Sequence, residues 1–147
     1  MSQSALQLER YFFSKVSIEA SKQIKAQPKM GAATRLEAAR NNKDRNRFLL
    51  SLTVSLTAPQ DTPASYCGEV QVIGFFRIHP DLPPDQQDKL ISVTGASILY
   101  GVAREMIVNV TNRGPWPAVT LPCVDFNDSN TTAPAQAEPK QPAAARA

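Results

Sequence analysis

The residues that could carry chemistry in this sequence are few and far apart. It contains two cysteines, Cys67 and Cys123, and one histidine, His79. A nucleophile needs a neighbouring base, and a zinc site needs closely spaced Cys and His ligands. The sequence holds no CxxC, HExxH, GxSxG or glycine-rich phosphate loop. We therefore expect no catalytic residue, no metal site and no cofactor; an enzyme that uses Cys67 or His79 is the alternative.

The basic residues are concentrated in one segment. The formal net charge is +3, but residues 22–47 carry eight Lys and Arg side chains against Glu37 and Asp44. A basic segment can bind the phosphates of nucleic acid, yet this one contains no aromatic residue on which a base could stack. We expect a solvated basic loop, with RNA or DNA binding through residues 22–47 as the less favoured alternative.

Hydrophobic periodicity predicts the elements that must position any site. Apolar residues alternate from Phe48 to Ala58, which is typical of a strand with one buried face. Residues 66–78 resemble its hairpin partner, and residues 11–20 also have strand character. We expect residues 21–46 to form a crossover loop with a helical turn at 32–40.

The same alternation assigns side chains to the two faces of the expected sheet. On the strand at 11–20, Phe12, Val16 and Ile18 point one way, while Lys15, Ser17 and Glu19 take the alternate positions. On the strand at 66–78, the residues that join the buried face are Val70, Val72, Phe76 and Ile78. Those expected on the other face are Cys67, Glu69, Gln71 and Ile73.

A long helix and a polar tail complete the chain. From Gln86 to Thr111, apolar residues recur at helical spacing, over a length of ~39 Å. Gly95 and Gly101 each weaken such a helix by ~1 kcal/mol relative to Ala, so we expect close packing or a kink there. No stretch approaches the ~18 apolar residues of a membrane span, and we expect no membrane insertion. Residues 127–147 lack aromatic and branched aliphatic side chains, which predicts a disordered Ala/Pro-rich tail.

The order of these segments resembles the SecB family, the bacterial chaperones of protein export. The resemblance begins at LERYFFSKVSIEA and continues through FLLSLTVSLTA and CGEVQVIGFF. It is strongest at ILYGVAREMIVNVTNRGPWPAVTLPCVDF, where Ala103-Arg104-Glu105 and Arg113-Gly114 are in register with the family pattern. We therefore predict a SecB-like chaperone domain over residues 1–126.

The resemblance implies an α+β fold, with a four-stranded antiparallel sheet and a long helix packed on one face. It also implies a homotetramer, built as a dimer of dimers, that works in the cytoplasm. The implied activity is that of a holdase, which binds unfolded preproteins without ATP and delivers them to the export ATPase SecA. The residues point to oligomers independently, because an amphipathic helix and a one-sided sheet leave more apolar surface than one subunit readily covers.

Two sets of site residues follow from the resemblance. The first lines a groove for clients and comprises Ile18, Met30, Trp116, Val119, Leu121, Val124 and Phe126. Trp116 is the best candidate because it lies between two prolines in a loop, whereas Leu121 and Phe126 have a competing role as core residues. The second set, for SecA docking on the exposed sheet face, is Glu19, Cys67 and Glu69. Lys15 stands where the family has an acidic residue, and its charge opposes a basic partner.

The sequence departs from the family pattern at two places. Ala26-Gln27-Pro28 stands where relatives carry a tryptophan before Gln-Pro, and the polar tail replaces a C-terminal helix. Both departures would shrink an apolar groove. They favour, as an alternative within the same family, a SecB-like chaperone dedicated to particular clients such as an antitoxin.

Overall fold

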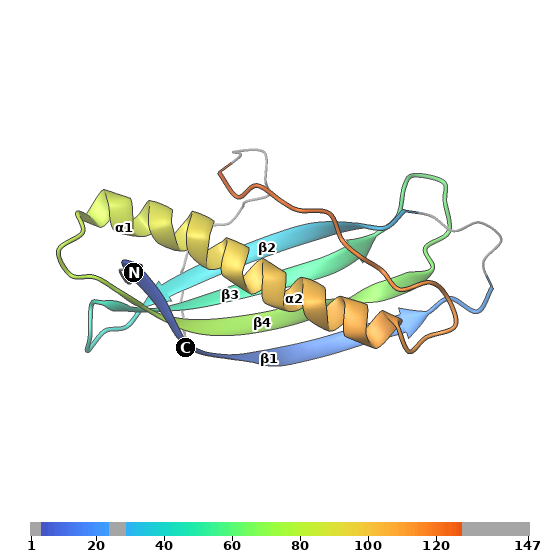
Figure 1. Cartoon of the computed structure of the whole chain (residues 1–147), viewed down its shortest axis with the longest axis horizontal. Coiled ribbons are helices and arrows are strands. Elements are labelled where there is room, and N and C mark those ends of the chain that lie inside the picture. The colour runs from blue at the N-terminus through green and yellow to red at the C-terminus, as the bar shows by residue number, and fades with distance from the viewer. Residues whose placement is uncertain (1–3, 24–28, 128–147) are drawn as a thin grey trace.

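The computed structural model describes residues 4–23 and 29–127. A four-stranded antiparallel sheet carries one long, interrupted helix across one of its faces (Figure 1). The strands are β1 (Leu6–Ala20), β2 (Gly31–Arg40), β3 (Arg47–Thr57) and β4 (Tyr66–Ile78). The helices are α1 (Pro84–Leu90) and α2 (Ala96–Thr111), joined by a π-helical turn, η1 (Ile91–Gly95). The order β1-β4-β3-β2 leaves β1 and β2 as edge strands, and the predicted fold class is confirmed.

Strand β2 corrects the prediction of a crossover loop over residues 21–46. Residues 31–40 pair with β3 from Gly31 opposite Thr57 to Arg40 opposite Phe48, and no helical turn forms at 32–40. Ala, Leu, Glu and Arg in this stretch favour a helix in isolation, but pairing with the apolar edge of β3 decides the outcome. The predicted loop is therefore wrong for residues 31–40. Residues Ala26-Gln27-Pro28, where the sequence departs from the family pattern, lie outside the described residues.

The face of the sheet under the helix, here called the covered face, holds the core. Period two on β3 and β4 is confirmed by the buried side chains Phe48, Leu50, Leu52, Val54, Val70, Val72, Phe76 and Ile78. From α2, Leu99, Ala103 and Ile107 are fully buried against them. The opposite face, here called the open face, carries Cys67, Glu69, Gln71 and Ile73, as the alternation predicts.

Two irregularities in β1 change which side chains reach each face. The pairing of β1 with β4 shifts by one residue between Leu8 and Arg10 and again between Phe13 and Lys15. Because an extra residue reverses the alternation, Phe12 pairs with Ile73 on the open face, whereas Val16 pairs with Val70 on the covered face. The prediction that Phe12 points the same way as Val16 and Ile18 is therefore wrong.

The predicted helix at 86–111 is confirmed, with bounds Pro84–Thr111 and an interruption at η1. Gly95, at the end of η1, lies so close to the sheet that a Cβ there would be 3.0 Å from a Leu50 methyl group. Apart from its chain neighbours and the nearby backbone of α2 itself, no atom among the described residues lies within 4 Å of a Cβ built at Gly101. By length and composition alone this helix would pass as a membrane span, but one side of it packs on the sheet.

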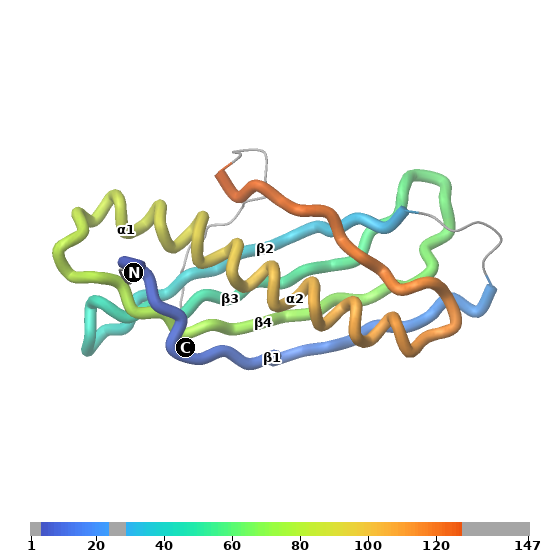
Figure 2. Tube along the Cα trace, viewed as in Figure 1, coloured from blue at the N-terminus to red at the C-terminus, as the bar shows by residue number. Residues whose placement is uncertain are grey.

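After α2 the chain turns back along the helix as an extended segment, here called the strap (residues 115–127; Figure 2). Glycine is needed at position 114 of this turn because a Cβ there would collide with the Tyr66 side chain. The predicted disordered tail lies outside the described residues, apart from Asn127.

Candidate functional site

Helix α2 divides the covered face into two flanks of different character. On one side the strap runs over β2 and β3, and we call this the strap flank (Figure 1). On the other side lies edge strand β1, and we call this the open flank (Figure 1). The strap flank is covered by the chain itself, whereas apolar side chains of the open flank reach the surface.

The start of the strap is fixed by hydrogen bonds to two buried side chains. The Tyr66 hydroxyl is 3.1 Å from the Thr111 carbonyl oxygen and 3.2 Å from both the backbone nitrogen and the carbonyl oxygen of Trp116. The Thr111 hydroxyl donates to the Ile107 carbonyl at 2.7 Å and accepts the Val119 N–H at 2.9 Å. These contacts satisfy backbone groups that the strap would otherwise bury without partners.

The middle of the strap is fixed to α2 through Tyr100. The Tyr100 hydroxyl donates to the Pro122 carbonyl at 2.6 Å, and the Phe126 ring packs edge-on at 5.8 Å from the Tyr100 ring. Burial raises the pKa of the Tyr100 hydroxyl above its ordinary value. Arg104 also donates to the Cys123 sulfur at 3.4 Å, so the strap is held along more than half of α2.

All seven residues predicted to line a client groove lie in or against one hydrophobic cluster. Three of them, Met30, Val119 and Leu121, are buried within the subunit and so form its core. Leu121 is therefore a core residue, which is the competing role that the sequence left open for it. The other four, which are half-buried and reach the surface, are Ile18, Trp116, Val124 and Phe126. Trp116 is additionally tethered, because its indole N–H donates to the Ser21 carbonyl at 2.9 Å.

The open flank contains a groove that the sequence prediction missed. It has a volume of about 480 Å³ and is lined mainly by Tyr11, Phe13, Ile98, Gly101, Val102 and Met106. Tyr11 and nearby Val16 are 47% and 43% exposed, which is high for large apolar side chains on a covered face. The signal that could have found it is the second apolar stripe of the helix, formed by Val102 and Met106.

The residues predicted to dock SecA lie together on the open face. Glu19 pairs directly with Cys67, and Glu69 is opposite Ser17 on the same pair of strands. The Lys15 ammonium is 2.7 Å from a Glu69 carboxylate oxygen, and Ser55 donates to the other oxygen at 3.4 Å. The hydrogen bond and positive charge of Lys15 lower the pKa of the Glu69 carboxyl.

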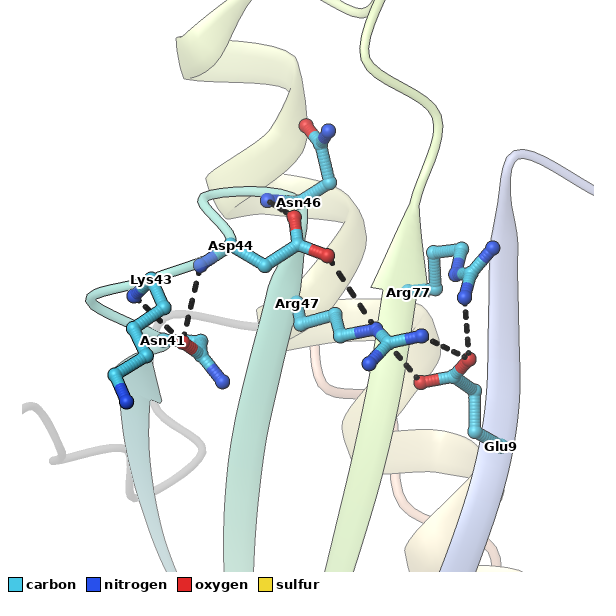
Figure 3. Close-up of polar contacts among 7 residues, drawn as sticks. All are labelled: Glu9, Asn41, Lys43, Asp44, Asn46, Arg47 and Arg77. Atoms are coloured by element: carbon cyan, nitrogen blue, oxygen red, sulfur yellow. Dashed lines mark hydrogen bonds and ion pairs between the residues drawn. The ribbon is translucent and has the colours of Figure 1, made fainter.

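Several side chains of the basic segment, residues 22–47, have partners in the fold. Arg40 stacks over Phe48 at 4.2 Å and donates to the Arg45 carbonyl. Arg47 forms ion pairs with Glu9 and Asp44, at 3.4 and 3.5 Å (Figure 3). These contacts tie the turn between β2 and β3 to the sheet, so the predicted solvated loop is wrong for residues 31–47, while residues 24–28 lie outside the described part of the chain.

The candidate chemical residues stay apart in the structure. Cys67 and Cys123 are exposed, and His79 accepts the Asp81 N–H at 3.2 Å in the turn before α1. Over residues 4–23 and 29–127, no three His, Cys, Asp or Glu side chains form a group that would hold a metal ion.

Comparison with known proteins gives consistent matches. The family model "Preprotein translocase subunit SecB" matches residues 1–136. The protein-export protein SecB of Psychrobacter cryohalolentis is 28% identical over 145 residues, covering 92% of this chain and 91% of that protein. The SecB of Chromobacterium violaceum is 30% identical over 129 residues, covering 84% of each chain.

A solved structure shares the fold. It is a SecB-like chaperone of Mycobacterium tuberculosis in complex with a peptide from an antitoxin, and it matches with a TM-score of 0.67 at 14% identity. The match covers 82% of this chain and 91% of that one.

Proposed function

This chain belongs to the SecB family, and from that premise we propose that it is an ATP-independent holdase that keeps preproteins competent for translocation in the cytosol. Members of this family are chaperones rather than enzymes, and they bind unfolded client polypeptides. The observation that carries the proposal is the apolar surface on both flanks of α2, half-buried on the strap flank and open on the other.

The strap flank supports client binding through its half-buried residues. Trp116, Val124 and Phe126 present apolar surface beside a backbone that already follows an extended path. A non-native chain that covers such surface gains about 25 cal/mol per Å² of apolar area buried. This gain depends on area rather than on a particular sequence, which suits a chaperone with many clients.

A holdase assay tests the proposal with paired substitutions on the strap. Val124→Ser with Phe126→Ser removes half-buried apolar surface, while Thr120→Ala changes an exposed neighbour and serves as the control. We expect the wild type and the control to suppress aggregation of a chemically unfolded protein at near-stoichiometric ratios, and the double variant to lose this suppression. Circular dichroism verifies that each variant is folded. A wild-type protein that leaves aggregation unchanged would refute the proposal.

The open flank supports assembly of subunits, which we include in the proposal as a homotetramer built from dimers. Its groove lies beside the exposed side chains of Tyr11 and Val16, and Gly101 allows another chain to approach α2 closely. Native mass spectrometry should then give the mass of four chains, and Val102→Arg should give smaller species that remain folded. A wild type that is monomeric at micromolar concentration would contradict the assembly.

Delivery to SecA through Glu19, Cys67 and Glu69 is the final part of the proposal. Their shared position on the open face supports it, while the Lys15–Glu69 ion pair engages one of the carboxylates. We expect weak, salt-dependent binding to purified SecA, stronger with Lys15→Ala and weaker with Glu19→Gln. If neither substitution changes binding, the docking site is wrong, and the holdase assay is unaffected by that result.

A chaperone dedicated to an antitoxin is the second candidate. It is favoured by the fold that this chain shares with the mycobacterial chaperone, which was solved with an antitoxin peptide. It is also favoured by the ion pair between Lys15 and Glu69, because this pair engages a carboxylate that SecA docking would use. A panel of unrelated unfolded proteins separates the two candidates. Suppression of aggregation across the panel supports the general holdase, whereas suppression confined to one client class supports the dedicated chaperone.

A further inference from the structure

One end of the open face carries an exposed cluster of aromatic and arginine side chains. The Arg10 guanidinium lies over two rings, 5.5 Å from the centre of Phe12 and 5.1 Å from the centre of Phe75. The two rings are 6.1 Å apart, and Phe12 is 37% exposed. Arg10 and Phe12 reach this face because they lie between the two irregularities of β1, after Leu8 and after Phe13, so the cluster depends on a specific feature of this strand.

Apolar neighbours extend this cluster across the sheet. Ile73 is opposite Phe12, and Leu49 is opposite Phe75; both are half-buried on the open face. No helix or loop among the described residues covers these side chains, since α1, η1, α2 and the strap all lie on the other face (Figure 1). We call the surface formed by Arg10, Phe12, Leu49, Ile73, Phe75 and Arg77 the Arg10 patch.

Positive charge exceeds negative charge around the Arg10 patch. Arg47 and Arg77 both pair with the Glu9 carboxylate, at 3.4 and 3.1 Å, and Arg47 also pairs with Asp44 at 3.5 Å (Figure 3). With Arg10, three positive charges therefore lie among two negative ones. Arg10 itself forms no ion pair with any residue in the described part of the chain. Half of the Arg77 side chain remains exposed, at 53%. A ligand with carboxylates would therefore find two guanidinium groups within one short stretch of surface.

We propose that the Arg10 patch docks an extended acidic segment of a partner protein that also carries an aromatic or aliphatic side chain. A carboxylate of the segment pairs with Arg10 and Arg77, and its apolar side chain packs on Phe12, Ile73 and Phe75. The partner differs in charge from one that binds Glu19 and Glu69, which lie at the other end of β1 and β4. The Arg10 patch is thus a second docking surface, independent of the holdase proposal.

The contacts of the patch favour a polypeptide over a nucleic acid. Three arginines, Arg10, Arg47 and Arg77, lie among two carboxylates, those of Glu9 and Asp44. This small excess of positive charge suits a single carboxylate, whereas a nucleic acid needs a groove of positive charge that follows its phosphate backbone. The aliphatic side chains Leu49 and Ile73 add apolar surface that suits a protein side chain.

Peptide binding to the full-length protein tests the proposal. The probe is a fluorescent twelve-residue peptide of alternating Glu and Phe, with the same peptide carrying Gln for Glu as its neutral match. We expect the acidic peptide to bind and the neutral one to bind roughly ten-fold more weakly. Arg10→Gln and Phe12→Ser should each weaken binding roughly five-fold or more, because each removes one half of the recognition. Arg35→Gln, which removes an exposed charge elsewhere on the open face, is the matched control.

The outcomes that overturn the proposal are distinct from failure of the holdase. If the acidic peptide does not bind, or binds equally well to Arg10→Gln and Phe12→Ser, the patch is not its site. If a single-stranded oligonucleotide or an anionic phospholipid vesicle displaces the peptide and binds more tightly, the partner class is wrong. The Val124→Ser with Phe126→Ser variant separates the two proposals, since it should bind the acidic peptide like the wild type.

Discussion

The two flanks of α2 differ in how the apolar surface beside the helix is covered. On the strap flank, hydrogen bonds from Tyr66, Thr111 and Tyr100 fix an extended segment over the apolar surface. On the open flank, Tyr11 and Val16 keep nearly half of their surface in water, beside a groove of about 480 Å³. On the strap flank the chain itself covers most of the apolar surface and leaves half-buried side chains for the proposed clients, whereas on the open flank no described segment covers the groove that we propose for assembly.

The largest effect is expected from removing an apolar side chain through which the strap packs on the core. Leu121 is 2% exposed, so Leu121→Ala leaves a cavity and should lower the free energy of unfolding by about 2–5 kcal/mol. Urea denaturation monitored by circular dichroism measures the loss. Thr120→Ala, at the exposed adjacent position, should change stability by less than about 0.5 kcal/mol. Equal effects of the two changes would mean that the strap is not part of the core.

A matched pair of tyrosine substitutions compares the flanks directly. Tyr66→Phe removes the hydroxyl between Thr111 and Trp116 and should cost about 1–3 kcal/mol, because it leaves buried backbone groups unpaired. Tyr11→Phe, on the open flank, removes a hydroxyl that has no hydrogen bond within the described residues, and should cost less than about 0.5 kcal/mol. Thermal unfolding of both variants at one protein concentration gives the comparison, and similar losses would contradict it.

The pH dependence of the strap follows from Tyr100. Tyr100→Phe should cost about 0.5–1.5 kcal/mol at neutral pH through loss of the hydrogen bond to Pro122. The pKa of this hydroxyl is raised in the folded protein, so its contribution is complete below the unfolded pKa and declines as pH rises through the folded pKa. The difference in stability between wild type and variant should therefore shrink at strongly alkaline pH. A difference that stays constant as Tyr100 ionises, followed by ultraviolet absorbance, would contradict this account.

Local periodicity was sufficient to predict β3, β4 and the long helix. Their buried positions follow period two or the helical repeat closely, so the sequence itself indicates which side chains are inside. Strand β2 was missed because its residues favour a helix, and only its pairing with β3 makes it a strand. Phe12 was assigned to the wrong face because one extra residue in β1 leaves no trace in the hydrophobic pattern.

The candidate site was predictable only in part, and for a similar reason. The resemblance identified the strap residues, but whether Val119 lies on a surface or in a core depends on contacts with Thr111 and the sheet. The groove of the open flank joins Tyr11 to Val102, which are far apart in the sequence. Such a juxtaposition comes from the topology of β1 and α2 rather than from the composition of either element.

The smallest expected effect concerns Gly101, where one substitution should change subunit stability and subunit association in opposite directions. A Cβ at this position meets nothing within the described subunit, so Gly101→Ala should raise the free energy of unfolding of a dissociated subunit by about 0.5–1 kcal/mol through helix propensity. If a second copy approaches α2 there, the same methyl group should weaken assembly. Sedimentation equilibrium across a dilution series measures subunit association, and urea unfolding at the lowest concentration measures the subunit. A variant that is more stable and assembles as tightly as the wild type would show that no chain packs closely on the open flank at Gly101.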